Sequence, residues 1–370
     1  MPQLFRPKAG QETRFKFDDT PTYLFRLHVP QSAGSTDTAH VDSPAFPDDM
    51  NKTHKLGSAC GQDLLQLPPA EAATRLDTHL RWKCKYLKES PCNLMSWSSS
   101  LLFLLHYGFH RKTTDHDPKP KLSEISLIMI NTRDFPKQVF LRDLDALNYY
   151  YGYNQGLEKV KGWREIQYYF GEYLTQGHLD IRGRCVQMTM QQLIDGGLFR
   201  VICPALNKPN NNWIDWAKPV CKLRVGIRES HVVDQKQIRS AIFMAKDCVG
   251  DRFLVPFALM LLGLRSQRKD DEKIANTFRA MFTNEELNLG EIKYDVEAKR
   301  MLYGGTSVME ELKRFQELME MITNSSNDAI EKESQEDAIA TISDSFVRLS
   351  TNESPNAIFS SRRRRVVKKP

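Results

Sequence analysis

The chain has 370 residues, 41% of them hydrophobic and 26% charged, and a formal net charge of +6 at pH 7. This length is enough for two or three domains with a buried core. The longest apolar run, at 101–105, is far shorter than the roughly 20 residues that cross a bilayer. The first residues lack a basic segment followed by an apolar one, so we expect neither a membrane span nor a secretory signal peptide.

The seven cysteines argue against two common uses of this residue. Their number is odd and no two of them form a C-x-x-C pair, so the pattern indicates neither a disulfide framework nor a common zinc site. We therefore expect no metal and a reducing cell interior. The cysteines are Cys60, Cys84, Cys92, Cys185, Cys203, Cys221 and Cys248.

The positive charge is concentrated at the C-terminal end. Residues 362–365 are four arginines, and Lys368 and Lys369 follow, while the rest of the chain carries 46 basic and 46 acidic residues. A basic cluster in a Ser- and Asn-rich tail indicates a nuclear-import signal, so we expect a nuclear protein that contacts the import machinery through Arg362–Lys369. A weak nucleic-acid contact and a tail that only aids solubility are the alternatives.

The first part of the chain predicts an α+β domain at 20–204, preceded by an extension at 1–19. Alternating apolar side chains predict a strand at 23–29. Residues 31–62 are rich in Ser, Thr, Asp, Gly and Pro and predict a long loop. Helical spacing of apolar residues follows at 69–82, where two prolines mark the helix start.

The middle of this domain carries its most apolar segments. An extended run at 94–100 leads into a helix at 100–110 that is apolar nearly all round and must therefore be buried. The continuous apolar run at 125–130 predicts a strand covered on both faces. We expect irregular structure at 142–162 and strand-like alternation at 163–177.

Beyond these segments the pattern becomes helical. Helices are expected to resume at 184–193, and a change of composition at 205–213 separates the α+β domain from a small helical domain at 213–322. Residues 323–370 are expected to be a disordered basic tail. The expected helices of the second domain are one capped by Asp234 and ending near Cys248, one at 253–264, a short one opened by the capping box Thr283–Glu286, and one at 309–322.

Motifs for several common chemistries are missing from the sequence. There is no G-x-x-x-x-G-K-[ST], G-x-G-x-x-G, H-E-x-x-H or G-x-S-x-G pattern, which argues against phosphate-loop ATPases, Rossmann dehydrogenases, zinc proteases and lipase-type hydrolases. Polar residues inside strand-like runs stand out instead. Arg26 interrupts the first strand, Ser96 and Ser98 share one face of the run at 94–100, and Glu172 shares a face with apolar neighbours.

The segments that carry these residues resemble a known family. They are similar to an uncharacterised fungal domain of unknown function, which is itself similar to ADP-ribosyltransferase-like folds of the arginine-serine-glutamate class. The resemblance covers roughly residues 20–180. It is carried by Leu24-Phe25-Arg26, His79-Leu80-Arg81-Trp82, Ser96 to Phe103, Glu172-Tyr173-Leu174 and Gly177.

The resemblance implies a fold, a cofactor and residue roles. The fold would be an ADP-ribosyltransferase-like mixed sheet domain followed by the small helical domain. NAD would be the substrate, Arg26 would hold it, Ser96 and Ser98 would shape the pocket, and Glu172 would be catalytic. A protein would be the acceptor of ADP-ribose or a binding partner.

These residue types suit that chemistry. A guanidinium fork matches the oxygens of a pyrophosphate at two points, which favours arginine over lysine at position 26. Cleavage of the bond between nicotinamide and ribose develops an oxocarbenium-like cation, and a fixed carboxylate stabilises such a charge. Ser96 and Ser98 could orient that carboxylate or the ribose.

Each candidate also has a structural interpretation. Arg26 could be a strand-edge arginine paired with a surface carboxylate, and Glu172 could face solvent on an edge strand. Ser98–Ser100 could cap the apolar helix. His79 and Trp82, three residues apart on one helix face, are more typical of core packing.

One departure from the enzyme pattern narrows the expected activity. Many relatives that modify arginine carry a second acidic or amide residue two positions before the glutamate, and here that position is Phe170. Three options follow: transfer of ADP-ribose to another acceptor, hydrolysis of NAD, or a degenerate fold that binds partners without catalysis. The sequence therefore leaves an NAD-dependent enzyme and a non-catalytic interaction protein as the two hypotheses.

Overall fold

The structure is a computed structural model of the whole chain. It describes residues 2–46, 61–86, 92–114, 118–207, 217–228, 231–265, 272–300, 302–303, 306–307 and 309–352. The chain divides into two compact units, Met1–Thr323 and Asn324–Pro370, and each is described by itself.

The centre of the first unit is a six-stranded sheet with the order β6-β7-β4-β1-β5-β9. Each of its pairings is antiparallel, so the α+β class is confirmed. A smaller sheet, with the order β2-β3-β8, lies in the same unit. The strands are β1 Tyr23–His28, β2 Ser35–Thr36, β3 His40–Asp42, β4 Leu94–Ser98, β5 Ser126–Asn131, β6 Leu141–Arg142, β7 Glu172–Gln176, β8 His178–Asp180, β9 Cys185–Thr189, β10 Leu302–Tyr303 and β11 Thr306–Ser307.

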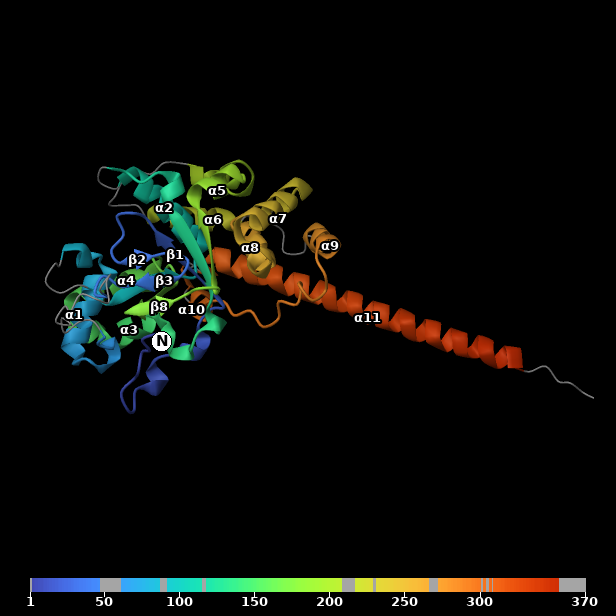
Figure 1. Cartoon of the computed structure of the whole chain (residues 1–370), viewed down its shortest axis with the longest axis horizontal. Helices are drawn as coiled ribbons and strands as arrows, with labels where there is room; N and C mark the ends of the chain where they lie inside the picture. The colour runs from blue at the N-terminus through green and yellow to red at the C-terminus, as the bar shows by residue number, and fades with distance from the viewer. Residues whose placement is uncertain are drawn as a thin grey trace, which may run out of the picture. The chain divides into compact units, whose positions relative to one another are not determined.

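Helices cover one face of the large sheet in two groups (Figure 1). α1, α3 and α4 pack at the β6–β7 end, and α2 and α5 to α9 pack at the β5–β9 end. The helices are α1 Pro69–Leu80, α2 Leu101–Thr114, α3 Asp143–Tyr150, α4 Gln155–Ile166, α5 Met190–Asp195, α6 Lys218–Ile227, α7 Gln235–Val249, α8 Asp251–Gly263, α9 Glu272–Met281, α10 Val296–Arg300 and α11 Glu310–Asn352.

Strand register assigns the side chains of the large sheet to its two faces. Phe25 lies opposite Ser98, and Ser98 lies opposite Glu172, so these three side chains share the helix-covered face. Alternation then places Ser96 on this face and Arg26 on the other one. The other face carries a separate apolar cluster around Trp97 and Tyr173, which includes Val41 and Leu179 of the small sheet.

Both β1 and β7 lie inside the sheet. β1 has β4 and β5 as neighbours, and β7 has β6 and β4. The edge-strand interpretations of Arg26 and Glu172 are therefore wrong.

The joint between β1 and β4 differs from its neighbours. β1 pairs with β5 over six residues and β4 pairs with β7 over five, but β1 and β4 share the single register pair Phe25 and Ser98. The sheet is therefore two well-paired halves joined at one short contact.

Two stretches of the α+β part differ from the expectation. Residues 142–162, expected to be irregular, form α3 and most of α4, because Leu147, Tyr150 and Leu157 are buried against α1. The stretch 184–193, expected to be helical, is divided: β9 occupies 185–189 and pairs with β5, and helix α5 begins at Met190.

The helical segment after residue 217 agrees with the expectation in its main helices. Asp234 caps α7 through a hydrogen bond from the Lys236 N–H, and α8 contains Pro256 in its second turn. Thr283 and Glu286 do form a capping box, but only a turn follows it. These helices pack on the same apolar core as β1 and α2, and the expected boundary at 205–213 falls largely outside the described residues.

The expected disordered tail at 323–370 differs from the structure in its described part, which ends at residue 352. Helix α11 begins at Glu310 in the first unit and ends at Asn352 in the second, so the described part of 323–370 is helical rather than disordered. The basic cluster Arg362–Lys369 lies outside the described residues.

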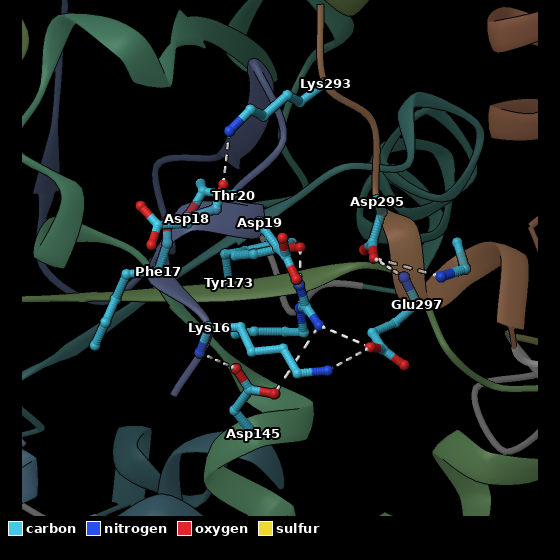
Figure 2. A network of polar contacts seen from close by, with 12 residues as sticks. Lys16, Phe17, Asp18, Asp19, Thr20, Asp145, Tyr173, Lys293, Asp295 and Glu297 are labelled. Carbon is cyan, nitrogen blue, oxygen red and sulfur yellow. Dashed lines mark hydrogen bonds and ion pairs between the residues drawn. The ribbon is translucent and has the colours of Figure 1, made fainter. Parts of the chain in front are cut away.

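The N-terminal extension is tied into the first unit by polar contacts. Figure 2 shows Lys16 between Asp145 of α3 and Glu297 of α10. The Lys16 N–H donates to Asp145 at 2.8 Å, and its ammonium donates to Glu297 at 3.1 Å. The ammonium of Lys293 donates to the carbonyl of Asp18 at 2.8 Å. The described part of this extension, residues 2–19, therefore belongs to the folded first unit.

Candidate functional site

A row of polar side chains lies on the helix-covered face, between the two apolar cores. The Ser96 hydroxyl donates to Glu172 Oε1 at 2.6 Å. Ser96 belongs to β4 and Glu172 to β7, and the contact arises because these two strands are neighbours in the sheet. We call the row formed by His79, Ser96, Glu172, Arg164 and Asp143 the polar seam.

Arg26 meets the polar seam from the opposite face of the sheet. Its Nη1 donates to the carbonyl of Ser96 at 2.8 Å, and its Nε donates to Thr36 Oγ1 at 3.2 Å. The side chain is buried, and burial lowers its pKa to about 10. Among the described residues Arg26 has no ion pair, so the proposed pairing with a surface carboxylate is wrong. A buried cation with only neutral partners favours an anionic ligand.

His28 lies two residues after Arg26 on the same strand, and its pKa is also lowered by burial. Burial lowers the pKa of His28 to about 4, and the positive charges of Arg26 and Arg111 act in the same direction. The imidazole is therefore neutral near pH 7.

Glu172 is held on both of its oxygens. Arg164 Nη2 donates to Glu172 Oε2 at 2.5 Å, while Ser96 contacts the other oxygen. Arg164 Nε also lies 3.2 Å from Asp143 Oδ2. These contacts fix the carboxylate of Glu172 in one orientation.

Asp143 is the most deeply buried acid of the polar seam. Its side chain is fully buried, and burial raises its pKa to about 8. Arg164 opposes this rise, and the nearby negative charges of Glu172 and Asp295 add to it. Arg164 thus serves two carboxylates, one of them in a strongly desolvated place.

His79 of α1 is the end of the polar seam and contacts Cys92. Its Nε2 lies 2.8 Å from Ser96 Oγ, and its Nδ1 lies 3.2 Å from Cys92 Sγ. Because Ser96 gives its single proton to Glu172, His79 Nε2 carries the hydrogen of this contact. Burial alone would lower the pKa of His79, but Cys92 and Glu172 raise it above its ordinary value. Both ring nitrogens of His79 therefore have polar partners, as a buried histidine requires whether it packs or takes part in chemistry.

Ser98, the fourth predicted site residue, is used differently. Its hydroxyl donates to the carbonyl of Phe170 at 2.6 Å and accepts from the Ser100 N–H at 3.0 Å. Ser100 Oγ in turn accepts from the Phe103 N–H at 3.1 Å. These bonds fit the helix-capping interpretation, and Ser98 is not part of the polar seam.

The chain enters β7 through a tightly packed corner. Gly171 has φ +64°, and a Cβ there would lie 1.8 Å from Ser99 Oγ, so only glycine fits. Phe170 stacks on Phe103 with ring centroids 4.4 Å apart.

The core-packing interpretation is wrong for Trp82, because its side chain is 46% exposed.

Two cavities of the first unit lie away from Arg26 and Glu172. One of about 240 Å³ is lined by residues that include Thr78, Cys92 and Leu94. Another of about 530 Å³ is lined by residues that include Tyr23 and Arg252. Neither is lined by Arg26, Ser96 or Glu172.

Sequence reasoning placed Arg26, Ser96 and Glu172 on strands that the structure brings together, and it missed Arg164, Asp143 and Cys92. Arg164 and Asp143 lie in the stretch expected to be irregular or strand-like, so no helix face was available to relate them. Cys92 stands only four residues before Ser96, a spacing that on a strand places both side chains on one face.

Comparison with known proteins leaves the family of this chain open. No family model, no curated protein and no solved structure matches it. In the part of the chain that the structure describes, no helix combines the length and the apolar character that crossing a membrane requires.

Proposed function

We propose that this chain is an ADP-ribosyltransferase-like protein that binds NAD and either transfers ADP-ribose or hydrolyses NAD. The observation that carries the proposal is Arg26, a buried guanidinium with a hydroxyl and a carbonyl as its described partners. A dinucleotide pyrophosphate is an anion with the two-point geometry that such a group binds.

Glu172 is suited to the chemical step. Arg164 and Ser96 hold its carboxylate in place through one hydrogen bond to each oxygen. A fixed negative charge stabilises the oxocarbenium-like cation that develops when the bond between nicotinamide and ribose breaks. Arg26 would act on the phosphates and Glu172 on the ribose. The two side chains project from opposite faces of the sheet, and Ser96 contacts Arg26 through its backbone carbonyl and Glu172 through its hydroxyl.

A second candidate function is a non-catalytic interaction protein with the same fold. The hydrogen bonds of Glu172 favour this function, because both carboxylate oxygens already have partners within the chain. It is also favoured by Phe170, which is stacked and buried where many relatives carry an acidic or amide residue. In this case the Arg164 ion pairs serve stability alone.

An NAD consumption assay distinguishes the two functions. We expect release of nicotinamide by the wild type and a loss of about 100-fold or more in Glu172→Gln, which removes the negative charge and keeps the shape. Glu165→Gln is the matched control, because Glu165 is an exposed acid on α4 that pairs only with Lys161 among the described residues. Equal turnover in wild type and Glu172→Gln would exclude Glu172 from the mechanism.

Binding and turnover are measured separately. Arg26→Lys keeps the charge and removes the fork, so we expect weaker NAD binding, while Glu172→Gln should bind NAD nearly as well as the wild type. NAD binding without turnover in the wild type would support the interaction protein. We further propose that Arg362–Lys369 directs the protein to the nucleus through the import machinery.

A further inference from the structure

Three potential metal ligands meet at the end of the polar seam. His79 comes from α1, Cys84 from the short 3-10 turn Lys83–Tyr86, and Cys92 from the residues just before β4. Their ligand atoms all lie within 4.8 Å of one another, and His79 Nδ1 is 3.2 Å from Cys92 Sγ. Ligands around a tetrahedral zinc ion are separated by about 3.5 to 3.8 Å, as zinc–nitrogen and zinc–sulfur bond lengths require. Small side-chain movements therefore suffice to enclose an ion.

We propose that His79, Cys84 and Cys92 bind one zinc ion and leave its fourth position to an exchangeable ligand. Two thiolates and one imidazole are a donor set that selects zinc over magnesium or calcium. This site departs from the sequence expectation, which excluded zinc because the cysteines form no C-x-x-C pair. The two cysteines are eight residues apart, and the fold brings them to the histidine.

The second ring nitrogen of His79 has the partner that a metal-bound histidine requires. Its Nε2–H donates to Ser96 Oγ, and Ser96 donates to Glu172. A metal-ligating histidine nearly always gives its free N–H to such an acceptor, which fixes the ring and the nitrogen that faces the metal. Here that arrangement leaves Nδ1 directed at Cys92. Ser96 and Glu172 are therefore outer partners of the zinc site.

The fourth position has space available beside it. Cys92 lines the cavity of about 240 Å³, together with Thr78 and Leu94. A water molecule or a small anion in this space could be the fourth ligand of the ion. The ion holds His79, and through His79 the Ser96 hydroxyl, in one orientation. This positioning role would serve the proposed NAD chemistry, but the metal site does not rest on it.

Metal analysis of the full-length protein tests the proposal. After expression with zinc and purification with a reductant, we expect one zinc per chain, and loss of that zinc in Cys84→Ser and Cys92→Ser. Cys221→Ser is the matched control, since Cys221 is another half-buried free cysteine and its variant should keep the metal. Ser96→Ala should retain zinc with affinity weakened by about 10- to 100-fold, as expected for an outer partner.

A second measurement is independent of whether the cysteine variants fold. Wild-type protein stripped of metal is titrated with Co²⁺, and thiolate-to-cobalt charge-transfer absorption with tetrahedral visible bands is expected at one equivalent, followed by displacement with Zn²⁺. Absence of both zinc and a thiolate–cobalt spectrum in folded wild type would overturn the proposal. So would a Cys84–Cys92 disulfide found by mass spectrometry in protein purified with a reductant. NAD turnover plays no part in these readouts, so the two proposals fail separately.

Discussion

Burial lowers the pKa values of Arg26 and His28 and raises the pKa of Asp143. Near Arg26 it keeps His28 neutral, and in the polar seam it raises the pKa of Asp143. Both effects follow from the cost of removing a charge from water. They predict different pH dependences of stability for single residues.

His28 should make the protein less stable in mild acid. Its pKa is about 4 in the folded protein and 6.5 in the unfolded chain, so the unfolded state binds the proton first. Stability linked to His28 is complete above about pH 6.5 and is lost as the pH falls towards about 4. We expect a loss of about 1–3 kcal/mol, reduced from the full shift because the side chain is partly exposed.

Urea unfolding of wild type and His28→Gln between these pH values measures this loss. The difference between the two proteins isolates His28 from the acids that titrate over the same range. Parallel stability curves for wild type and variant would show that His28 titrates normally.

Arg164 should be essential for stability because it serves two carboxylates. Arg164→Met leaves Asp143 fully buried without its ion pair and also frees Glu172, so we expect the free energy of unfolding to fall by about 3–5 kcal/mol. Adding Asp143→Asn replaces the buried carboxyl group that has lost its partner with a neutral amide and should restore part of the loss. Denaturant unfolding of the single and double variants forms a double-mutant cycle, and additive effects would contradict the pairing.

At the scale of elements, the corner before β7 determines where Glu172 stands. In Gly171→Ala, alanine must adopt the left-handed backbone conformation that glycine has at this position. Its methyl group also displaces Ser99, which donates to the buried carboxylate of Asp295 at 3.3 Å. We expect a loss of more than about 2 kcal/mol, because steric overlap adds to the backbone strain. Thermal and urea unfolding measure it.

Gly183→Ala provides the matched control. Gly183 has a similar φ of +70°, but a Cβ there meets nothing within 4 Å. Its variant should lose only about 1 kcal/mol from backbone strain. Equal losses in the two variants would show that the packing at Gly171 contributes nothing.

Elements with strong local signals were predictable from the sequence. The alternation at 23–29 gave β1, the apolar run after Ser100 gave α2, and Asp234 marked the start of α7. α3 and α4 were missed because their tyrosines and glycines have low helix propensity, and burial against α1 stabilises them instead. Local sequence does not contain that contribution.

In the candidate site, the strand positions of single residues were predictable, but the contacts between residues of different strands were not. The strand positions of Arg26, Ser96 and Glu172 followed from alternation, but the bond between Ser96 and Glu172 depends on β4 and β7 being neighbours. Ser96 and Glu172 are 76 residues apart in the chain, and no local pattern specifies the pairing of strands so distant in sequence. The same holds for the meeting of His79 with Cys84 and Cys92.

At the scale of the whole molecule, the basic tail is the only strong charge asymmetry in an otherwise balanced sequence. Deleting residues 361–370 should abolish nuclear accumulation of a fluorescent fusion, because the six positive charges are the recognised feature. Deleting residues 353–360, which include no lysine or arginine, is the control and should leave it intact. Equal nuclear signal in both deletions would end the import proposal.

The short joint between β1 and β4 has a mechanical consequence. One residue pair and the bond from Arg26 to the Ser96 carbonyl link the two halves of the sheet, so a side chain replaces part of the missing backbone ladder. Below the joint, one apolar cluster also packs side chains of both halves together, including Leu24 of β1 and Trp97 of β4. A molecule that binds the guanidinium would compete with its hydrogen bond to the Ser96 carbonyl, and ligand binding at Arg26 would therefore weaken the contact between β1 and β4.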